Sequence, residues 1–188
     1  GAVKIDHVDI KDLEIDSLRK QIAMVFQDNI LFEGTIRENI LLGKEDATEK
    51  EVKNAVHNAC LDEFIDSLPN VLDTEIGERG TKLSGGQKQR ISMARAYLKN
   101  APILIMDDSV SAVDVKTETK ILSNIKEKRA GKTTIIIASR ISTVSHLDKV
   151  IVLNDGEVEG FGSPKELLAT SKTYAKMAML QELEKEEC

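Results

Sequence analysis

The sequence predicts an α/β fold in which a mostly parallel sheet is flanked by helices. In the second half of the chain, short apolar runs alternate with segments of helical periodicity, in the order strand, helix, strand, helix, strand. This order indicates right-handed crossovers between parallel strands. The runs lack polar alternation, which is typical of strands covered on both faces. The expected strands are 103–106, 134–138 and 150–153, and the expected helices are 114–129 and 142–146.

The first half of the chain opens with strand-like alternation over residues 3–10, which precedes a buried strand over 22–26. Helical patterns dominate residues 35–100. Within them, Thr48 and Glu51 form a capping box ahead of apolar residues at helical spacing.

The end of the chain carries turn and helix-start patterns. Asn154-Asp155-Gly156 predicts a hairpin that pairs residues 150–153 with 157–161. Ser163-Pro164-Lys165-Glu166 has the N-cap, the early proline and the acidic third position of a helix start. Residues 171–188 predict a charged surface or docking helix.

Composition is that of an ordinary globular protein, and it excludes several classes. A length of 188 residues with 41% hydrophobic and 31% charged residues suits one domain, with room for a subdomain. A net charge of −6 and 3% aromatic residues argue against nucleic-acid binding. Cys60 and Cys188 are too few for a disulfide framework or a cysteine-rich zinc site, and the histidines are scattered. The longest apolar run, 22–26, is far below the roughly 20 residues of a membrane span.

The segment Leu83-Ser84-Gly85-Gly86-Gln87, at the start of an apolar-periodic helix, predicts an anion site. Ser84 is the expected N-cap, and Gln87 closes a capping box. The two glycines leave first-turn N–H groups uncovered, so a phosphate group can approach the backbone closely. A plain helix start is the alternative. It does not explain two glycines, each of which costs about 1 kcal/mol relative to alanine in a helix.

Asp107 and Asp108 follow the apolar strand 103–106. A carboxylate there lies at the carboxyl edge of the sheet, where ligands of open α/β sheets bind. An aspartate in this place commonly holds the Mg²⁺ of a nucleotide. The alternative is that both aspartates only end a strand at a turn.

In chain order, these motifs resemble the ATP-binding-cassette (ABC) ATPases. Gln27 follows a buried strand, residues 83–87 read LSGGQ, Asp107 follows four apolar residues, and residues 111–114 read SAVD. The resemblance covers nearly the whole chain. Three further segments resemble the exporters of that family in particular, namely 27–32, 35–40 and 74–80.

The resemblance implies a P-loop NTPase-like sheet with an inserted α-helical subdomain. The core would comprise residues 1–27 and 99–170, the helical subdomain about 28–98, and a C-terminal helix about 171–187.

The resemblance also implies a role for each matching residue. Gln27 would sense Mg²⁺ and the γ-phosphate of ATP and face the coupling helices of a transmembrane domain. Asp107 would be the Walker B aspartate that holds Mg²⁺. Ser111 and Asp114 would belong to the D-loop, which crosses a dimer interface. The signature motif that binds the γ-phosphate held by an opposite subunit would be Leu83, Ser84, Gly85, Gly86 and Gln87.

Two positions depart from the family pattern. The residue after the Walker B aspartate is usually a glutamate that acts as general base, and here it is Asp108. The switch position is usually histidine, and here it is Ser139. Aspartate is one methylene shorter than glutamate, and a misplacement near 1 Å can cost about 100-fold in rate. The two changes resemble the degenerate half of a heterodimeric exporter. The alternative is a working variant site.

The phosphate-binding loop G-x-x-x-x-G-K-[ST] does not occur in the sequence. Gly131-Lys132-Thr133 is not such a loop, because the required first glycine would fall at Lys126 and a strand follows. In the family this loop lies upstream of the first strand, so the chain resembles the domain without its N-terminal part. An excised or truncated form is expected rather than a natural protein without the loop.

The sequence therefore predicts the ATPase domain of an exporter, at the cytoplasmic face of the cell membrane. ATP and Mg²⁺ are the expected cofactors of the full domain and are not expected to bind this fragment, which is expected to be inactive alone. The expected partners are transmembrane coupling helices and a second nucleotide-binding domain in a heterodimer, with no nucleic acid. The alternatives are a soluble ABC ATPase and a catalytically dead interaction module.

Overall fold

The structure is a computed structural model that describes residues 1–77 and 80–186, with side chains described up to residue 183. The chain divides into two compact units, Gly1–Ile137 and Ala138–Cys188. Each unit is described by itself. No helix within the described ranges is long and apolar enough to cross a membrane.

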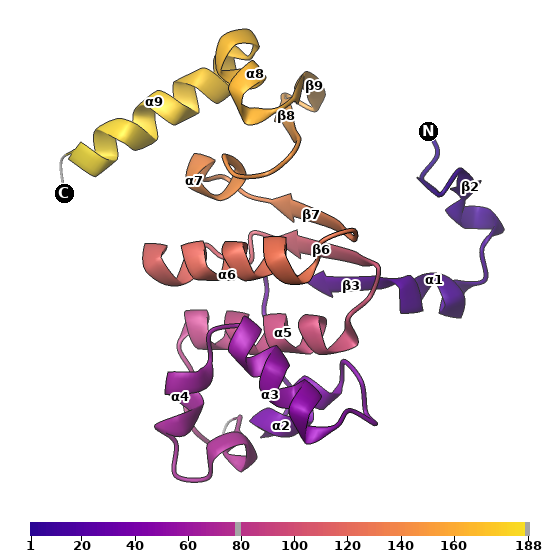
Figure 1. Cartoon of the computed structure of the whole chain (residues 1–188), viewed down its shortest axis with the longest axis vertical. Coiled ribbons are helices and arrows are strands. Elements are labelled where there is room, and N and C mark those ends of the chain that lie inside the picture. The colour runs from indigo at the N-terminus through magenta and orange to yellow at the C-terminus, as the bar shows by residue number, and fades with distance from the viewer. Residues whose placement is uncertain (78–79, 187–188) are drawn as a thin grey trace. The chain divides into compact units, whose positions relative to one another are not determined.

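A three-stranded parallel sheet lies at the centre of the first unit (Figure 1). Its strands are β3 (Ile22–Val25), β6 (Ile103–Asp107) and β7 (Thr133–Ile137), in the order β3-β6-β7. The register joins Ala23 to Leu104 and Leu104 to Thr134. The predicted parallel sheet is therefore confirmed for these three strands.

Helices bury one face of this sheet. Helix α5 (Gly85–Lys99) packs against β3, and α6 (Val115–Lys128) forms the crossover from β6 to β7. Asp114 is the N-cap of α6, as the sequence predicts. The shared core includes Ala23, Val25, Ile91, Met93, Ala94, Leu104, Met106, Ile121 and Ile125.

The opposite face of the sheet is partly open, which corrects the prediction of strands covered on both faces. Burial alternates along each strand, because successive side chains point to opposite faces. Met24, Ile105 and Ile135 form one row across the three strands. Met24 is 44% exposed, Ile135 48% and Ile137 51%.

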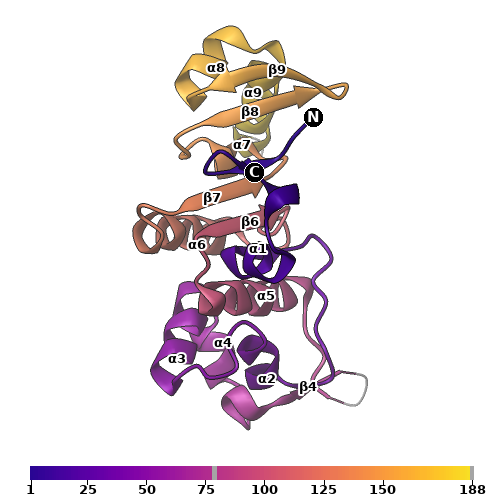
Figure 2. The same ribbon diagram turned by 90° about the vertical axis from the view of Figure 1, so that its right-hand side faces the viewer.

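A helical layer lies on the side of α5 away from the sheet in both views (Figure 1, Figure 2). It contains α2 (Ile36–Leu41), α3 (Glu49–Asn58) and α4 (Asp62–Asp66). The capping box predicted at Thr48 is present at the start of α3, and Thr35 forms another at the start of α2. A short antiparallel pair, β4 (Gly34–Thr35) with β5 (Glu75–Ile76), and the 3-10 turn Val71–Asp73 complete the layer.

The N-terminal segment is less regular than its alternation predicts. Strands β1 (Lys4–Ile5) and β2 (Val8–Asp9) form a two-stranded antiparallel ribbon that precedes a 3-10 turn, Ile10–Asp12. Helix α1 (Ile15–Gln21), which the sequence analysis did not predict, leads into β3.

The second unit packs a hairpin against helices. Its elements are α7 (Ile141–Val144), β8 (Val150–Asn154), β9 (Glu157–Gly162), α8 (Pro164–Thr170) and α9 (Lys172–Glu186). Val144, Val152, Leu167 and Tyr174 form its core.

The predicted hairpin and the helix start at Ser163 are both confirmed. Asp155 and Gly156 both have positive φ, 49° and 80°, as a tight two-residue turn requires. The prediction that 150–153 extends the parallel sheet is wrong, because β8 pairs antiparallel with β9 in a sheet of its own. A two-residue turn returns the chain immediately, so β9 supplies the hydrogen-bonding edge that β8 needs.

Candidate functional site

The turn of residues 84–87, hereafter the signature turn, forms the start of α5. Ser84 Oγ accepts a hydrogen bond from the Gln87 N–H at 3.2 Å, and Gln87 Oε1 accepts one from the Ser84 N–H at 2.8 Å. This is the capping box that the sequence predicts. The first N–H groups of a helix have no intrahelical partner, and the helix dipole favours an anion beside them. The turn therefore has the backbone chemistry of a phosphate site.

The two glycines of the signature turn have different surroundings. A Cβ added at Gly85 would meet nothing closer than Ala112 Cβ, at 3.8 Å. A Cβ at Gly86 would come within 2.7 Å of the Ala112 carbonyl oxygen. Gly85 is exposed and keeps the turn open to a ligand, whereas Gly86 allows the turn to lie against the neighbouring loop.

That neighbouring loop, residues 107–114, is hereafter the aspartate loop. Asp107 is the last residue of β6, so its carboxylate lies at the carboxyl end of the parallel strands. Asp108 has a left-handed backbone, with φ of 43°, and its N–H donates to the Ile137 carbonyl at 2.9 Å. This bond extends the β6–β7 ladder by one step and fixes where the loop leaves the sheet.

The signature turn and the aspartate loop are joined by Gln89, a residue that the sequence analysis did not single out. Its Nε2 donates to the Asp108 carbonyl at 3.1 Å, and its Oε1 accepts from the Ala112 N–H at 3.3 Å. Ser111 Oγ also donates to the Asp108 carbonyl, at 2.9 Å. The sequence did contain a signal for Gln89, because this polar residue falls on the apolar face of the helix that the pattern predicts.

Asp114 closes the aspartate loop and begins α6. Its carboxylate accepts from the Thr117 N–H at 3.0 Å. Hydrogen bonds from the side chain and backbone of Thr117 hold the pKa of Asp114 below its ordinary value. Asp114 thus caps α6 in this chain.

Strand β3 ends at Val25, and Gln27 is the second residue after it. The Gln27 side chain is exposed. Its carbonyl accepts a hydrogen bond from Asn29 Nδ2 at 3.1 Å. Gln27 shares the carboxyl end of the sheet with Asp107, because β3 and β6 are parallel neighbours.

The segment after Gln27 is fixed by two residues that the sequence analysis missed. The Asn39 side chain, almost fully buried, donates to the Phe32 carbonyl at 2.9 Å and accepts from the Phe32 N–H at 2.9 Å. Arg95 of α5 donates to the Asn39 carbonyl at 2.9 Å, and its guanidinium lies 5.9 Å from the centre of the Phe32 ring. The segment is thereby attached to the same helix that begins with the signature turn.

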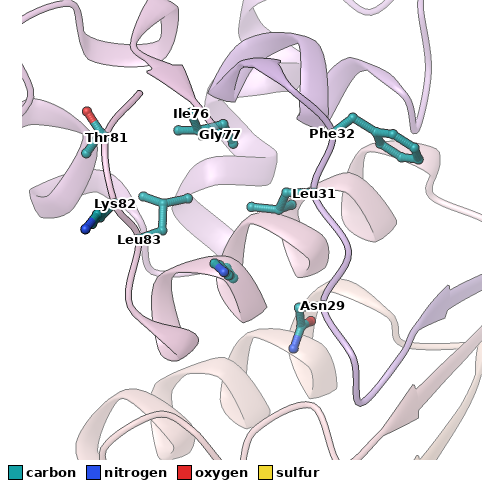
Figure 3. A pocket seen from close by; sticks show the side chains of 9 residues that line it. Asn29, Leu31, Phe32, Ile76, Gly77, Thr81, Lys82 and Leu83 are labelled. Carbon is teal, nitrogen blue, oxygen red and sulfur yellow. The ribbon is translucent and has the colours of Figure 1, made fainter. Parts of the chain in front are cut away.

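A cavity of about 360 Å³ lies between this segment and the approach to α5 (Figure 3). Leu31 and Leu83 lie on facing walls, and Lys82 is at the rim. The remaining lining residues are Asn29, Phe32, Ile76, Gly77, Thr81 and Lys88. Glu78 and Arg79, part of the exporter-like segment 74–80, lie outside the described residues.

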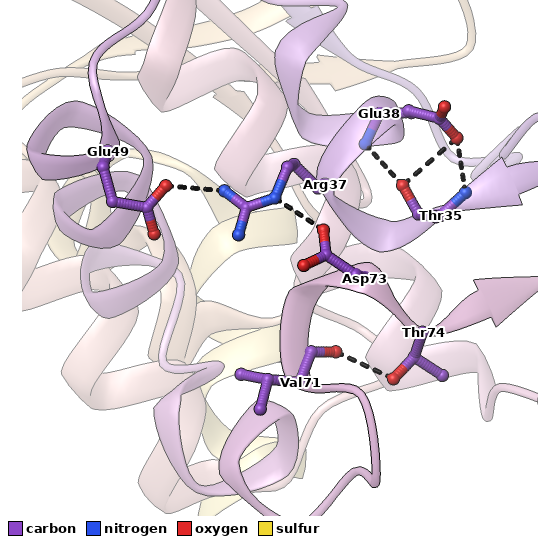
Figure 4. A network of polar contacts seen from close by, with 7 residues as sticks. All are labelled: Thr35, Arg37, Glu38, Glu49, Val71, Asp73 and Thr74. Atoms are coloured by element: carbon purple, nitrogen blue, oxygen red, sulfur yellow. Dashed lines mark hydrogen bonds and ion pairs between the residues drawn. The ribbon is translucent and has the colours of Figure 1, made fainter.

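A polar network joins the elements of the helical layer (Figure 4). Arg37 of α2 pairs with Glu49 of α3 and with Asp73, each at 2.7 Å. The hydrogen bond that Arg37 donates to the Asp73 carboxylate is the main cause that raises the pKa of Arg37. These partly exposed pairs add little stability individually, and their role is to link α2, α3 and the turn before β5.

Ser139 belongs to the second unit, where its side chain is exposed. Its carbonyl accepts from Gln181 Nε2 at 3.3 Å, and Gln181 Oε1 accepts from the Ile141 N–H at 2.8 Å. A glutamine of α9 therefore holds the backbone on both sides of Arg140. Sequence reasoning did not find this contact, which joins residues some 40 positions apart.

At the carboxyl end of the sheet, Asp107 has the chemistry to bind a magnesium ion that a nucleotide brings with it. Among residues 1–77 and 80–183, no group of three or more His, Cys, Asp and Glu side chains is placed to hold a metal ion. Mg²⁺ in nucleotide sites is commonly bound by one or two carboxylates together with phosphate oxygens and water. Asp107 is half-buried at the sheet edge and suits this role.

Comparison with known proteins gives a family match and close relatives. The model of the family described as "ABC transporter" matches residues 1–111. The chain is 47% identical over 183 residues to a probable multidrug resistance ABC transporter ATP-binding/permease protein of Bacillus subtilis. It is 46% identical over 183 residues to putative multidrug export ATP-binding/permease proteins of Staphylococcus aureus. These alignments cover 97% of this chain and 31% and 32% of the relatives.

A solved structure of a bacterial Atm1-family ABC exporter with ATP bound is similar, with a TM-score of 0.92 and 43% sequence identity. It covers 96% of this chain, which spans 32% of that one. The chain therefore spans about a third of the length of the relatives that it matches.

Proposed function

Because this chain belongs to the ABC transporter family and matches the nucleotide-binding domain of its exporters, we propose that it powers ATP-driven export across a membrane. In this proposal the domain closes against a second nucleotide-binding domain, and each ATP site uses residues of both. The chain gives its signature turn to the partner's site and its aspartate loop to a site of its own.

The exposed signature turn carries the proposal. Ser84 and Gly85 are exposed. The nearest atom to a Cβ placed on Gly85 would be Ala112 Cβ, at 3.8 Å. A γ-phosphate can therefore reach the first-turn N–H groups from outside the domain. This supports a turn that serves an ATP molecule bound by another subunit.

The chain's own site is proposed to be weak. Asp107 and Gln27, at the carboxyl ends of neighbouring strands, would hold Mg²⁺, which neutralises the phosphate charge that develops during transfer. Asp108 would orient the attacking water less well than a glutamate, and Ser139 offers no imidazole. Ser111 and Asp114 would lie at the interface. The 188-residue chain alone, which lacks the phosphate loop, is proposed to be inactive and to bind Mg-ATP no tighter than about millimolar.

The cavity between Leu31 and Leu83 supports a membrane-embedded partner. Its apolar walls and the lysines Lys82 and Lys88 suit an amphipathic helix end with acidic residues. We assign this surface to a coupling helix of a transmembrane domain, which would place the domain at the cytoplasmic face of the membrane. The relatives are described as ATP-binding/permease proteins, and this favours the exporter over a soluble ABC ATPase.

The test compares two substitutions in the full-length transporter assembled with its partner. Gly85→Asp places a carboxylate where the partner's γ-phosphate would dock, and ATP turnover should fall by about 100-fold or more. Asp108→Asn should lower turnover by less than about threefold, because that site is already weak. Asn54→Asp is the control for an added surface carboxylate, since Asn54 is an exposed residue of α3 with an ordinary helical backbone. Equal damage from Gly85→Asp and Asp108→Asn would refute the degenerate-half proposal.

The same experiment addresses a catalytically dead interaction module, which Asp108 and Ser139 also permit. In that case the signature turn is dispensable. Gly85→Asp would then leave both turnover and assembly at the level of Asn54→Asp.

A further inference from the structure

Gln89 is the one large polar side chain in the buried stripe of the described α5 helix. It is 2% exposed, and its buried neighbours along the helix are Ile91, Ser92, Met93, Ala94, Ala96 and Leu98. A primary amide is costly to remove from water unless its donors and acceptors find partners. The position therefore selects glutamine for its hydrogen bonds rather than for its packing.

Both hydrogen bonds of the Gln89 amide end on backbone atoms of the aspartate loop. One reaches the Asp108 carbonyl at 3.1 Å, and the other comes from the Ala112 N–H at 3.3 Å. The amide thus spans the loop from the proposed general-base position to the segment that touches Gly86. Bonds to backbone atoms do not depend on the side chains that the loop carries.

The signature turn is held on its other side by the next residue of the helix. Arg90 donates to the Gly86 carbonyl at 3.3 Å and to the Cys60 carbonyl at 2.5 Å. Gly86 also lies so close to the Ala112 carbonyl that a Cβ would approach it to 2.7 Å. A displacement of the aspartate loop would therefore move the signature turn with it. Gln89 provides the hydrogen bonds that connect the two segments.

We propose that Gln89 is a positioning residue that transmits the state of the aspartate loop to the signature turn. The inference rests on the proposed function, in which the loop serves the chain's own ATP site and the turn serves the partner's. Under that arrangement Gln89 connects two ATP sites within one chain. It touches neither nucleotide, and it acts by fixing the turn relative to the loop.

The first measurement does not depend on ATP. Amide hydrogen exchange is followed in the full-length protein, free of nucleotide, for Gln89→Met, which keeps the side-chain volume and removes both bonds. Exchange of the Ala112 N–H should rise at least tenfold. Ser92→Ala is the matched control, because Ser92 is buried on the same helix and its Oγ has no hydrogen-bond partner among the described residues. It should leave exchange within twofold.

The second measurement is ATP turnover by the same proteins, normalised to the folded fraction. Gln89→Met should lower kcat about tenfold and leave KM within twofold, because the signature turn engages the γ-phosphate only when the dimer closes. A loss of folding alone would lower the folded fraction and leave the normalised kcat unchanged.

Unchanged exchange in Gln89→Met overturns the inference, whatever the turnover. Raised exchange with kcat within twofold of the wild type overturns it as well. Raised exchange together with a wild-type protein that never hydrolyses ATP supports the link and refutes the proposed function. The failures of the two proposals are thus distinguishable.

Discussion

At the scale of single residues, Gly85 and Gly86 share a chemical identity but differ in what surrounds them. We predict that Gly86→Ala lowers the free energy of unfolding by about 1–3 kcal/mol, because its methyl group would press on the Ala112 carbonyl. Gly85→Ala should be neutral or stabilising by up to about 1 kcal/mol, because alanine favours the helix and meets open space. Urea denaturation of both variants checks this. Similar midpoints for the two would contradict it.

Arg129 is a buried charge held by oxygen atoms, and it gives a second prediction at this scale. The residue is 6% exposed and donates to the carbonyls of Ala101, Pro102 and Thr133 and to Thr134 Oγ1, at 3.0–3.2 Å. Arg129→Met should cost about 2–4 kcal/mol of unfolding free energy, since several buried acceptors lose a charged donor. Thermal melting checks this. Arg129→Lys, which keeps one donor group, should recover part of the loss, and a cost below about 1 kcal/mol for methionine would refute the prediction.

At the scale of elements, the start of α9 depends on a carboxylate of β9. Glu159 accepts hydrogen bonds from Ser171 Oγ at 2.6 Å, from the Thr173 N–H at 2.9 Å, and from Thr173 Oγ1. These bonds lower the pKa of Glu159 to about 2. A lowered pKa means that the attachment is fully present above the ordinary glutamate value near 4.3 and is lost as the pH falls toward 2.

We therefore predict that protection of the Thr173 amide against hydrogen exchange decreases between pH 4.5 and 2.5. NMR titration of Glu159 measures the pKa directly, and a value near 4.3 would contradict the prediction. Glu159→Gln is the control, because an amide at this position keeps an acceptor that does not titrate.

The helix starts were the most predictable elements, because their signals are local. Thr48, Ser84, Asp114 and Ser163 each cap a helix where the sequence predicts one. Helix α1 was missed because it is capped by Glu14, which is not among the usual N-cap residues. The hairpin partner of β8 was predicted correctly from its local turn residues, but its place in the parallel sheet was predicted wrongly. The order of strands and helices along the chain does not show which sheet a strand joins.

In the candidate site, too, the features with local sequence patterns were predicted and most of those that depend on distant contacts were not. The capping box of the signature turn and the place of Asp107 at the end of β6 were predicted from residue types and spacing. Gln89 and Gln181 were missed, because each acts on backbone atoms of a segment distant in sequence. Asn39 was missed although its bonds to Phe32 span only seven positions, because no turn or capping pattern marks them. Only the folded chain shows which polar residue meets which carbonyl.

At the scale of the whole molecule, the proposed asymmetry can be tested by repair. Asp108→Glu with Ser139→His would restore the carboxylate reach and the imidazole, yet turnover per transporter should rise less than twofold. Asp108 has φ of 43°, a left-handed conformation that aspartate adopts more readily than glutamate, so the longer side chain adds backbone strain. Domain opening also often limits such cycles.

Single-turnover hydrolysis at the repaired site, with the partner's general base substituted, checks this prediction. Turnover equal to that of an enzyme with two competent sites would show that Asp108 and Ser139 were the whole defect. No hydrolysis at the repaired site would instead place the remaining defect in the partner's signature motif or in the loop geometry.

The open face of the parallel sheet has a consequence for the aggregation of the purified protein in solution. Strand β7 is the last in the order β3-β6-β7, and its sequence from Thr133 to Ile137 carries no charge. Ile135 and Ile137 point away from the buried face, so β7 offers an apolar, β-branched edge of the kind that recruits strands from other molecules. Solutions of the chain should therefore be limited by colloidal stability before they are limited by unfolding. Shelf life would depend on concentration, and one lysine on this strand would extend it more than any improvement of the core.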